Sequence, residues 1–413
     1  MENNEVIVYG ASWCPDCRRS KQFLGEHQIP YKWVDIEQNP EAEKYVLATN
    51  NGKRIIPLIF FPDGTFLVEP ENSELAAKLE LKTQASRSHY DLIVAGGGPA
   101  GLTAAIYSAR EAIDTLVIER GGFGGQAALT AMLDNMPGFP EGIAGLDFSS
   151  RLRQQAEKFG VELLQAQEVN EIYSDHNYKC LKTADGSQFS ARAILLATGS
   201  HYRRLNLPGE ADYIGAGIHF CATCDGPFYK GKKVVVVGGG NSAAEESLLL
   251  TKFADHVTIL VRKGQFRASN IIIENINDDP DIDVFFHTEV VEFVGERSEL
   301  TKLRIKNNQT GVEEELPTDG AFIFIGLDPN TTFLRDSGIL LDKWGFIITG
   351  HALKHQKDLS GDFEGRDPFL LETNIPGIFA AGDARDTSTK QVVSAAGEGS
   401  TAALMVREYL KQV

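Results

Sequence analysis

Four of the five cysteines form two pairs, and in each pair two residues separate the cysteines. The pairs are Cys14-Pro15-Asp16-Cys17 and Cys221-Ala222-Thr223-Cys224. This spacing lets two sulfurs join or separate with little backbone movement, which suits two-electron thiol–disulfide exchange. A zinc site would need two further thiolates or histidines at a suitable spacing, and the two pairs lie far apart in the chain. We therefore predict two redox pairs and no metal site, with the unpaired Cys180 as a small core residue.

The residues around the first pair indicate how its two sulfurs divide the work. Pro15 suits the first turn of a helix, which places Cys14 at the helix N-terminus, where the dipole lowers the pKa of a thiol. The two arginines that follow the pair add to this effect, whereas Asp16 opposes it. We expect Cys14 to be the exposed nucleophile and Cys17 the resolving thiol.

Three further residues are candidates for supporting roles. Asp225 directly follows the second pair and can supply or accept a proton when the dithiol opens. His219 lies two residues before Cys221 and could influence its reactivity, although a structural role is the simpler interpretation. Pro57 begins a predicted strand and would face the first pair if its peptide bond is cis; an ordinary edge-strand proline is the alternative.

Two glycine-rich turns carry the signature of dinucleotide binding. Each follows a short apolar strand and opens a helix; the turns are Gly96-Gly97-Gly98-Pro99-Ala100-Gly101 and Gly238-Gly239-Gly240-Asn241-Ser242-Ala243. The first glycine permits a tight turn, the second lets the backbone approach a pyrophosphate, and the third position allows helix and strand to pack closely. Because the whole pattern occurs twice, we predict two nucleotide sites.

The residues after the next strand distinguish the two nucleotides. After the first turn, this strand ends at Glu119, whose carboxylate accepts hydrogen bonds from ribose hydroxyls and repels a 2′-phosphate. After the second turn, the strand is followed by Arg262, Lys263 and Arg267, which suit the extra phosphate of NADP(H). A solvated basic turn is the alternative. We predict FAD at the first site and NADPH at the second.

Later segments complete the predicted FAD site. One strand ends at Thr198-Gly199, and another ends at Gly382-Asp383, before Lys390-Gln391 and a helix rich in small residues. These segments flank the second glycine-rich turn, so the NADPH domain is expected to be inserted into the FAD domain. We assign residues 89–203 and 331–413 to the FAD domain and residues 204–330 to the NADPH domain.

The first 81 residues form a separate predicted unit. We expect strands at residues 5–10, 31–36 and 55–61, a helix after the first cysteine pair and a final helix at residues 73–81. Residues 82–88 are polar, small and aperiodic, which is typical of a linker.

Length and composition limit the class of protein. The 413 residues predict two to three domains, and 42% hydrophobic with 23% charged residues is typical of globular chains. The net charge of −17 argues against nucleic acid or an anionic membrane as the main partner. The acidic start is unlike a signal peptide, and no apolar run approaches the roughly 18 residues of a membrane helix. We expect a soluble, cytoplasmic protein.

From about His89 to Val413, these motifs resemble those of low-molecular-weight thioredoxin reductases. The matching segments are Gly96–Gly101, Gly124-Gly125-Gln126, Asn135–Gly138, Ala197–Gly199, Cys221–Gly226, Gly238–Ala243, Arg262–Arg267, Ile325–Asn330 and Gly382-Asp383. Residues 1–81 resemble a glutaredoxin or mycoredoxin-like domain through Trp13–Cys17 and Ile56-Pro57. The expected fold is therefore α/β, with an N-terminal thioredoxin-fold domain followed by two Rossmann-like dinucleotide-binding domains.

The resemblance implies a homodimer with one FAD per subunit, to whose site Gly125, Gln126 and Asn135 are assigned. It also implies that Cys224 lies nearer the flavin, that Cys221 attacks the acceptor disulfide, and that the NADPH domain rotates. Two features depart from the families. Arg262-Lys263 replaces a pair of arginines, and Val68-Glu69-Pro70-Glu71 replaces the Gly-Gly-x-Asp stretch of glutathione-using glutaredoxins. The second departure argues against glutathione as a direct ligand.

We predict an NADPH-dependent relay from FAD to Cys221/Cys224, then to Cys14/Cys17, and then to an external disulfide. That disulfide belongs to a protein such as thioredoxin or peroxiredoxin, or to a small molecule. One alternative is a reductase of a separate thioredoxin or peroxiredoxin, with residues 1–81 as an accessory module. Another is an oxygen-coupled dithiol oxidase, against which the three cations that follow the second nucleotide strand argue.

Overall fold

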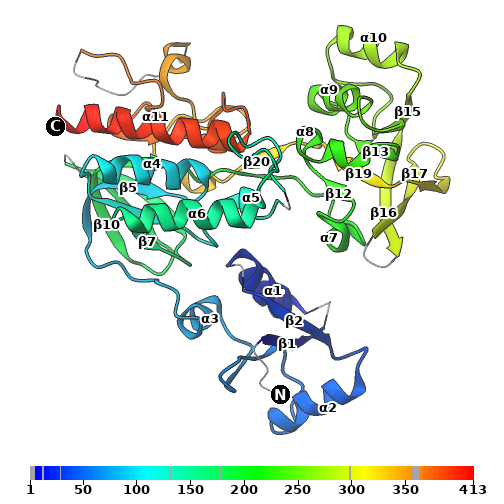
Figure 1. Ribbon diagram of the computed structural model, residues 1–413, viewed down its shortest axis with the longest axis horizontal. Helices are drawn as coiled ribbons and strands as arrows, with labels where there is room; N and C mark the ends of the chain where they lie inside the picture. The colour runs from blue at the N-terminus through cyan, green and yellow to red at the C-terminus, as the bar shows by residue number, and fades with distance from the viewer. Residues whose placement is uncertain are drawn as a thin grey trace. The chain divides into compact units, whose positions relative to one another are not determined.

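The computed structural model describes the chain except residues 1–4, 12–13, 28, 131, 177, 297–298, 356–362 and 364. Trp13, part of the motif noted above, lies outside the described residues. By their contacts the described residues divide into two units (Figure 1). The first comprises residues 1–129, 145–199 and 329–413, and the second residues 130–144 and 200–328.

The N-terminal part of the first unit is a four-stranded sheet with helices. Its elements are β1 (Val6–Gly10), α1 (Pro15–Glu26), β2 (Tyr31–Asp35), α2 (Pro40–Thr49), β3 (Leu58–Phe60), β4 (Phe66–Val68) and α3 (Asn72–Lys78). The strand order is β2-β1-β3-β4, with β1 parallel to β2 and antiparallel to β3. Helix α2 was not predicted from the sequence, although Asn39 caps it and Pro40 stands in its first turn.

Residues 82–88, which the sequence predicts to be a linker, are held against the dinucleotide-binding part of the first unit. The carboxylate of Glu162 accepts hydrogen bonds from the Ser86 amide at 2.7 Å and from the Tyr90 hydroxyl at 2.7 Å. Lys82 pairs with the same carboxylate at 3.0 Å, and its carbonyl accepts from the Gln165 amide at 2.9 Å. The segment is therefore anchored by a buried acid at one strand.

The rest of the first unit contains a seven-stranded sheet. Its strands are β5 (His89–Ala95), β6 (Thr115–Ile118), β7 (Glu162–Leu164), β8 (Val169–Asp175), β9 (Tyr178–Thr183), β10 (Gln188–Leu196) and β21 (Ile378–Ala380). The order is β7-β6-β5-β10-β9-β8, and β21 pairs with β10. The helical segments are α4 (Pro99–Arg110), α5 (Gly125–Ala128), α6 (Gly145–Lys158), η2 (Thr332–Leu334), η3 (Gly350–His355), η4 (Gly382–Ala384) and α11 (Val392–Leu410).

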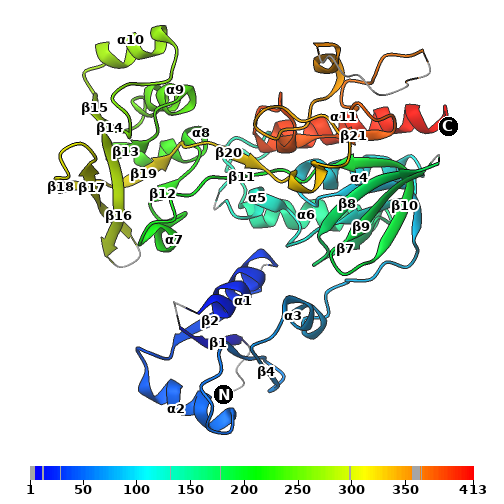
Figure 2. The same ribbon diagram turned by 180° about the vertical axis from the view of Figure 1, so that it is seen from behind.

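Alternation along β5 explains why this sheet is buried on both faces. Leu92 and Val94 pack into one apolar cluster with residues of α4 and α11, whereas Ile93 and Ala95 pack into a second cluster on the other face. Helices α4 and α11 lie side by side (Figure 2). They can approach closely because Gly399 of α11 has no side chain at the contact. A Cβ there would stand only 2.1 Å from the Ala100 carbonyl oxygen of α4.

The second unit is built on a five-stranded parallel sheet with the order β12-β19-β13-β14-β15. Its strands and those of the accompanying three-stranded sheet are β12 (Ile218–His219), β13 (Lys233–Val237), β14 (His256–Val261), β15 (Ile282–Phe286), β16 (Thr288–Glu296), β17 (Glu299–Asn307), β18 (Glu313–Pro317) and β19 (Gly320–Ile323). The helical segments are α7 (Glu210–Tyr213), α8 (Ala222–Asp225), η1 (Gly226–Tyr229), α9 (Asn241–Leu250) and α10 (Asn270–Asp278). Strands β11 (Ser200–Tyr202) and β20 (Leu327–Pro329) form a two-stranded sheet.

The valine run of β13 is shared between two layers. Val234 and Val236 pack with residues of α9 and α10, and Val235 and Val237 pack with residues of β16 and β17. The parallel sheet is therefore covered by helices on one face and by the three-stranded sheet on the other. The predicted α/β fold class is confirmed, and the domain boundaries inferred from the sequence stay a prediction.

Candidate active site and nucleotide sites

The second cysteine pair stands at the start of a one-turn helix, α8. Cys221 is its N-cap, and its Sγ accepts a hydrogen bond from the Cys224 amide at 3.2 Å. The two cysteines are joined as a disulfide. Strand β12 leads into the pair and is held in register by β19, so the parallel sheet positions the sulfurs.

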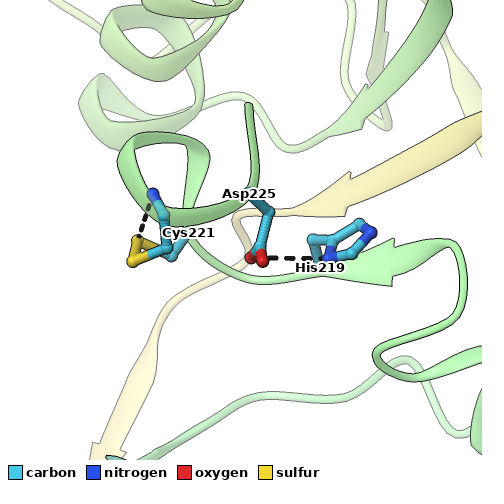
Figure 3. The surroundings of a disulfide bond; sticks show 4 residues. His219, Cys221 and Asp225 are labelled. Carbon is cyan, nitrogen blue, oxygen red and sulfur yellow. Dashed lines mark hydrogen bonds and ion pairs between the residues drawn. A yellow bond between two sulfur atoms is a disulfide. The ribbon is translucent and has the colours of Figure 1, made fainter. Parts of the chain in front are cut away.

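A row of polar side chains continues from this disulfide (Figure 3). Asp225 closes α8, and its Oδ2 lies 3.4 Å from Nδ1 of His219. On the other side of the ring, His219 Nε2 lies 2.6 Å from the Tyr229 hydroxyl. The His219 side chain is 11% exposed, so its two ring nitrogens depend on these partners. The geometry links the predicted acid Asp225 to a histidine and a tyrosine.

A second carboxyl group lies behind α8. Glu246 of α9 accepts a hydrogen bond from the Ala222 amide, and its other oxygen, Oε2, is buried without a hydrogen-bond partner. Burial, together with the neighbouring Glu245, raises the pKa of Glu246. The charged form of Glu246 is therefore less favoured than that of an exposed glutamate.

The first cysteine pair has the same local geometry at a longer helix. Cys14 is the N-cap of α1, and its Sγ accepts a hydrogen bond from the Cys17 amide at 3.1 Å. The Ile56–Pro57 peptide bond is cis, which is the condition under which Pro57 was expected to face the first pair. The Cys14 thiol donates to the Ile56 carbonyl at 3.7 Å. Both thiols are free.

The structure corrects the prediction that Cys14 is exposed. Cys14 is only 3% exposed, because it packs with Ala11, Ile56 and Leu58 in one apolar cluster. Cys17 is fully buried in the same cluster, and a Cβ on Gly10 would stand 2.7 Å from its Sγ. Burial, helped by the hydrogen bond with Cys14, raises the pKa of Cys17 to about 12.

Arg19 is bound by acids and a carbonyl group near the first pair. Its guanidinium group donates to Asp16 at 2.8 Å and to the Pro70 carbonyl at 3.1 Å, and it lies 3.5 Å from Glu71. This arrangement ties α1 to the Val68-Glu69-Pro70-Glu71 segment that distinguishes the chain from glutathione-using glutaredoxins. The acids also neutralise Arg19, one of the two arginines that were expected to stabilise the Cys14 thiolate.

The first glycine-rich turn has the shape of a pyrophosphate cradle. Gly96 has a φ of 109°, and a Cβ there would stand 2.3 Å from the Ala197 carbonyl oxygen. A Cβ on Gly101 would stand 1.9 Å from the Gly96 carbonyl oxygen, whereas a Cβ on Gly98 would meet nothing within 4 Å. The backbone is thus crowded toward the protein and open at Gly98, where α4 begins.

Other predicted FAD residues gather around this turn. A Cβ on Gly125, at the start of α5, would lie 3.4 Å from the Gly98 Cα. Glu119 accepts hydrogen bonds from the Gly97 amide at 2.6 Å and the Gly121 amide at 2.8 Å, which fixes its carboxylate beside the turn. Gln126 belongs to α5, next to Gly125.

The strand ends β10 and β21 bring the remaining segments together, since these strands are paired in parallel. The Thr198 carbonyl accepts from the Asn330 side chain at 2.8 Å, and Gly199 has a φ of 66°. The Gly382 amide donates to Glu398 of α11 at 2.7 Å. Lys390 donates to the Arg385 carbonyl at 2.6 Å, and Gln391 caps α11.

Two buried oxygens at these strand ends fit a bound dinucleotide. Thr198 Oγ1 and Asp383 Oδ1 are buried without hydrogen-bond partners, and burial raises the pKa of Asp383. Unpaired buried oxygens are costly unless a ligand or water satisfies them. Together with the open face at Gly98, they fit FAD at this site.

The second glycine-rich turn lies beside the predicted basic residues. A Cβ on Gly240 would meet nothing within 4 Å, and Asn241 begins α9 there. The Arg267 amide donates to the Gly239 carbonyl at 2.7 Å, which places Arg267 next to the turn. The side chains of Arg262, Lys263 and Arg267 are exposed, and within the described part of the chain none of the three forms an ion pair. These features fit a nucleotide with an added phosphate.

Some site residues were placed by the structure in ways that the sequence did not indicate. Asn135 is exposed and belongs to the second unit, so its assignment to FAD stays a prediction. Ser242 lies in α9, and its role also stays a prediction. Tyr229 was missed, because an aromatic residue that follows a proline turn looks like a core residue. Arg385 and Glu398, paired at 3.0 Å behind Gly382, were missed because they lie on separate segments.

Comparisons with known proteins cover both parts of the chain. Residues 90–399 match the family model of the pyridine nucleotide-disulphide oxidoreductases, and residues 6–67 match that of glutaredoxins. Thioredoxin reductase from Listeria innocua is 38% identical over 78% of this chain and 95% of its own length. Thioredoxin reductase from Bacillus subtilis is 39% identical over 78% of this chain and 96% of its own length.

Solved structures give the same result. Thioredoxin reductase from Streptococcus pyogenes superposes with a TM-score of 0.70 at 35% identity, over 79% of this chain and 100% of that structure. Thioredoxin reductase from Giardia duodenalis superposes with a TM-score of 0.70 at 33% identity, over 79% and 100% of the two chains. Among the described residues, no helix is both long enough and apolar enough to cross a membrane.

Proposed function

The chain belongs to the pyridine nucleotide-disulphide oxidoreductase family, and from this premise we propose that it relays electrons through both cysteine pairs to an external disulfide. The resemblance to thioredoxin reductases and to a glutaredoxin domain is confirmed. The chain is an oxidoreductase that reduces disulfides with NADPH and FAD. What the proposal adds is the route through Cys14 and Cys17.

The residues of the two nucleotide sites account for the first stage. With NADPH as the hydride source, FAD bound here would supply the electron pair that reduces the Cys221–Cys224 disulfide. Gly98 and Gly125 would hold its pyrophosphate, with Asp383 beside them, and Arg262, Lys263 and Arg267 would bind the 2′-phosphate of NADPH. Asp225 stands next to the disulfide and can exchange a proton with it.

One observation supports the second stage. The Cys14–Cys17 pair has both thiols free and the same N-cap arrangement as the Cys221–Cys224 pair. In this stage the Cys221 thiolate attacks a Cys14–Cys17 disulfide, and the sulfur of Cys17 leaves. Cys17 then takes a proton readily because its pKa is raised to about 12. The Cys224 thiolate then attacks Cys221 in the Cys221–Cys14 mixed disulfide, which releases the Cys14 thiolate and re-forms the Cys221–Cys224 disulfide. An external disulfide can then oxidise the Cys14–Cys17 dithiol again.

The burial of Cys14 favours a second candidate function. At 3% exposure, its sulfur can react only after a local opening around Ala11 and Ile56. If that opening is too rare, the enzyme reduces a separate thioredoxin or peroxiredoxin directly, and residues 1–81 serve as an accessory module.

Replacing Cys14 by serine separates the two candidates. In Cys14→Ser, reduction of the bound flavin by NADPH should be unchanged, and turnover of protein disulfides should fall at least 100-fold, because the attacking thiol is lost. Cys180→Ser is the matched control, since it makes the same change at a buried cysteine outside both pairs. Full turnover in Cys14→Ser would overturn the relay and support direct reduction of an external thioredoxin.

Three further features complete the proposal. We propose that the enzyme is a homodimer, as the resemblance implies, and that its terminal substrate is a protein disulfide of the thioredoxin or peroxiredoxin kind. We also propose a cytoplasmic location, because redox-cycling dithiols depend on a compartment that keeps thiols reduced.

A further inference from the structure

Three polar side chains of the second unit form a row that starts at the residue after Cys224; they are Asp225, His219 and Tyr229. Asp225 Oδ2 lies 3.4 Å from His219 Nδ1 (Figure 3). On the other side of the ring, His219 Nε2 lies 2.6 Å from the Tyr229 hydroxyl. Tyr229 is 6% exposed and packs edge-on against Phe322, with ring centroids 5.4 Å apart. The row therefore runs from Asp225, which directly follows Cys224 in the chain, to a buried hydroxyl.

The two partners of His219 differ in what they can do. A carboxylate only accepts hydrogen bonds, whereas a tyrosine hydroxyl both donates and accepts. Burial, with Asp225 and Asp319 nearby, raises the pKa of Tyr229, so this hydroxyl keeps its proton. It can donate to neutral His219 or accept from protonated His219. The ring can therefore gain or lose a proton without leaving an unpaired buried donor.

We propose that His219 is a positioning residue that stores the proton which Asp225 delivers to a cysteine when the Cys221–Cys224 disulfide is reduced. The proposal deepens the proposed function, because it rests on reduction of this disulfide, but it does not depend on the relay to Cys14. A histidine is suited to this task because its ordinary pKa lies near neutrality.

Two electrons supplied by the established NADPH- and FAD-dependent activity break the S–S bond and leave two thiolates. The proton held by His219 passes through the Asp225 carboxylate to one of these thiolates. The products are one thiol, one thiolate, the Asp225 carboxylate and a neutral imidazole. Protonation of His219 from solvent resets the row.

Few other charged groups face this row. Asp319, just before β19, and Lys232, whose Nζ lies 5.3 Å from the centre of the Tyr229 ring, approach the tyrosine with opposite charges. Glu246 of α9 contacts the Ala222 amide at the start of α8. Of the described residues, Asp225 is the one for which an ion pair with His219 is found. A pH dependence that involves His219 should therefore reach the disulfide through Asp225.

The test compares two histidine–aspartate pairs in the holoenzyme. His219→Gln keeps a hydrogen-bond donor near Asp225 but cannot hold a proton. His256→Gln is the matched control, because His256 pairs with Asp283 at 3.0 Å on the same unit, remote in sequence from the cysteines. After reduction with dithiothreitol, the rate of alkylation of Cys221 and Cys224 by iodoacetamide is followed from pH 5 to pH 9 by mass spectrometry.

We expect a wild-type profile with an inflection in the range of histidine ionisation. That inflection should vanish in His219→Gln and persist in His256→Gln. Disulfide turnover in His219→Gln should fall about tenfold, less than the roughly 10²–10⁴-fold that a direct general acid contributes, because Asp225 is still present. The KM for NADPH should be unchanged. An alkylation profile identical to wild type would overturn the proposal. Failure of the relay would not affect these results, because Cys14 takes no part in them.

A second variant covers the case in which His219→Gln does not fold. Tyr229→Phe keeps the ring that packs against Phe322 and removes the hydroxyl that accepts from protonated His219. The inflection should move to lower pH, because protonated His219 loses an acceptor, and turnover at neutral pH should fall about threefold. An unchanged inflection in Tyr229→Phe would also overturn the proposal.

Discussion

The two cysteine pairs share one backbone geometry but differ in the chemistry around it. In both, the first cysteine caps a helix and accepts a hydrogen bond from the amide of the second, at 3.1 Å in one pair and 3.2 Å in the other. The first pair stands on a twelve-residue helix, and Cys14 lies beside the carbonyl of Ile56, the residue before the cis proline. The second stands on a four-residue helix with Asp225 and His219 behind it.

This difference shows two ways to control a dithiol. A long helix supplies a dipole that favours a thiolate at its start, and burial keeps the proton on the partner thiol at Cys17. A one-turn helix has a much smaller dipole, and the proposed role of Asp225 gives the second pair an adjacent acid instead. On this proposal, the first pair is controlled by burial and the helix, and the second by proton exchange.

The largest effect expected from this comparison concerns the reactivity of Cys17. With a pKa raised to about 12, Cys17 in the reduced protein should carry a thiolate in only about one molecule in 10⁴ at pH 8. Since the thiolate is the nucleophile, its alkylation by iodoacetamide should rise about tenfold per pH unit from pH 7 to pH 10. Mass spectrometry of the Cys14- and Cys17-containing peptides measures this. Equal alkylation of both at pH 8 would contradict the assignment of Cys17 as the protonated, resolving thiol.

The next effect separates the two acids that accompany the pairs. Asp225→Asn should lower disulfide turnover about 100-fold, because it removes the proton donor next to the second pair. Asp16→Asn makes the same change between the cysteines of the first pair. There we expect less than a twofold change, because Asp16 is paired with Arg19 at 2.8 Å. Steady-state NADPH oxidation with a protein disulfide measures both, and equal losses would mean that the pairs are controlled alike.

The smallest effect concerns the segment that attaches the first pair to the rest of the first unit. Burial alone would raise the pKa of Glu162, but hydrogen bonds from Ser86, Tyr90 and Lys82 outweigh it and lower the pKa to about 2. A pKa below the ordinary value of a glutamate means that the charged form stabilises the fold at neutral pH. This contribution is lost as the pH falls through about 2.

Glu162→Gln should therefore loosen residues 82–88 at pH 7. We expect a loss of about 2 kcal/mol in local stability, the size of one or two hydrogen bonds to a charged group. Limited proteolysis of this segment should be faster, and turnover of a protein disulfide should change by no more than about twofold. Glu168→Gln is the control, because Glu168 is 62% exposed. Unchanged proteolysis in Glu162→Gln would show that Glu162 does not anchor the segment.

Much of the site was predictable because its motifs are local. The glycine-rich turns, the cysteine pairs and the residues after the nucleotide strands depend on contacts within a few residues, so their spacing is visible in the chain. Helix α2 was missed because its cap, Asn39, precedes a proline that also suits a turn. The exposure of Cys14 was wrongly predicted, because burial depends on Ile56 and Leu58, which are distant in sequence.

By itself, the sequence determined which chemistry is available: two dithiols, two nucleotide turns and an acid beside one dithiol. These follow from residue type and spacing, which backbone geometry translates directly into local structure. Tertiary structure alone decided which side chains meet across segments. It buried Cys14, anchored residues 82–88 on Glu162, and placed the hydroxyl of Tyr229 against His219, because packing brings together residues whose separation in the chain carries no local signal.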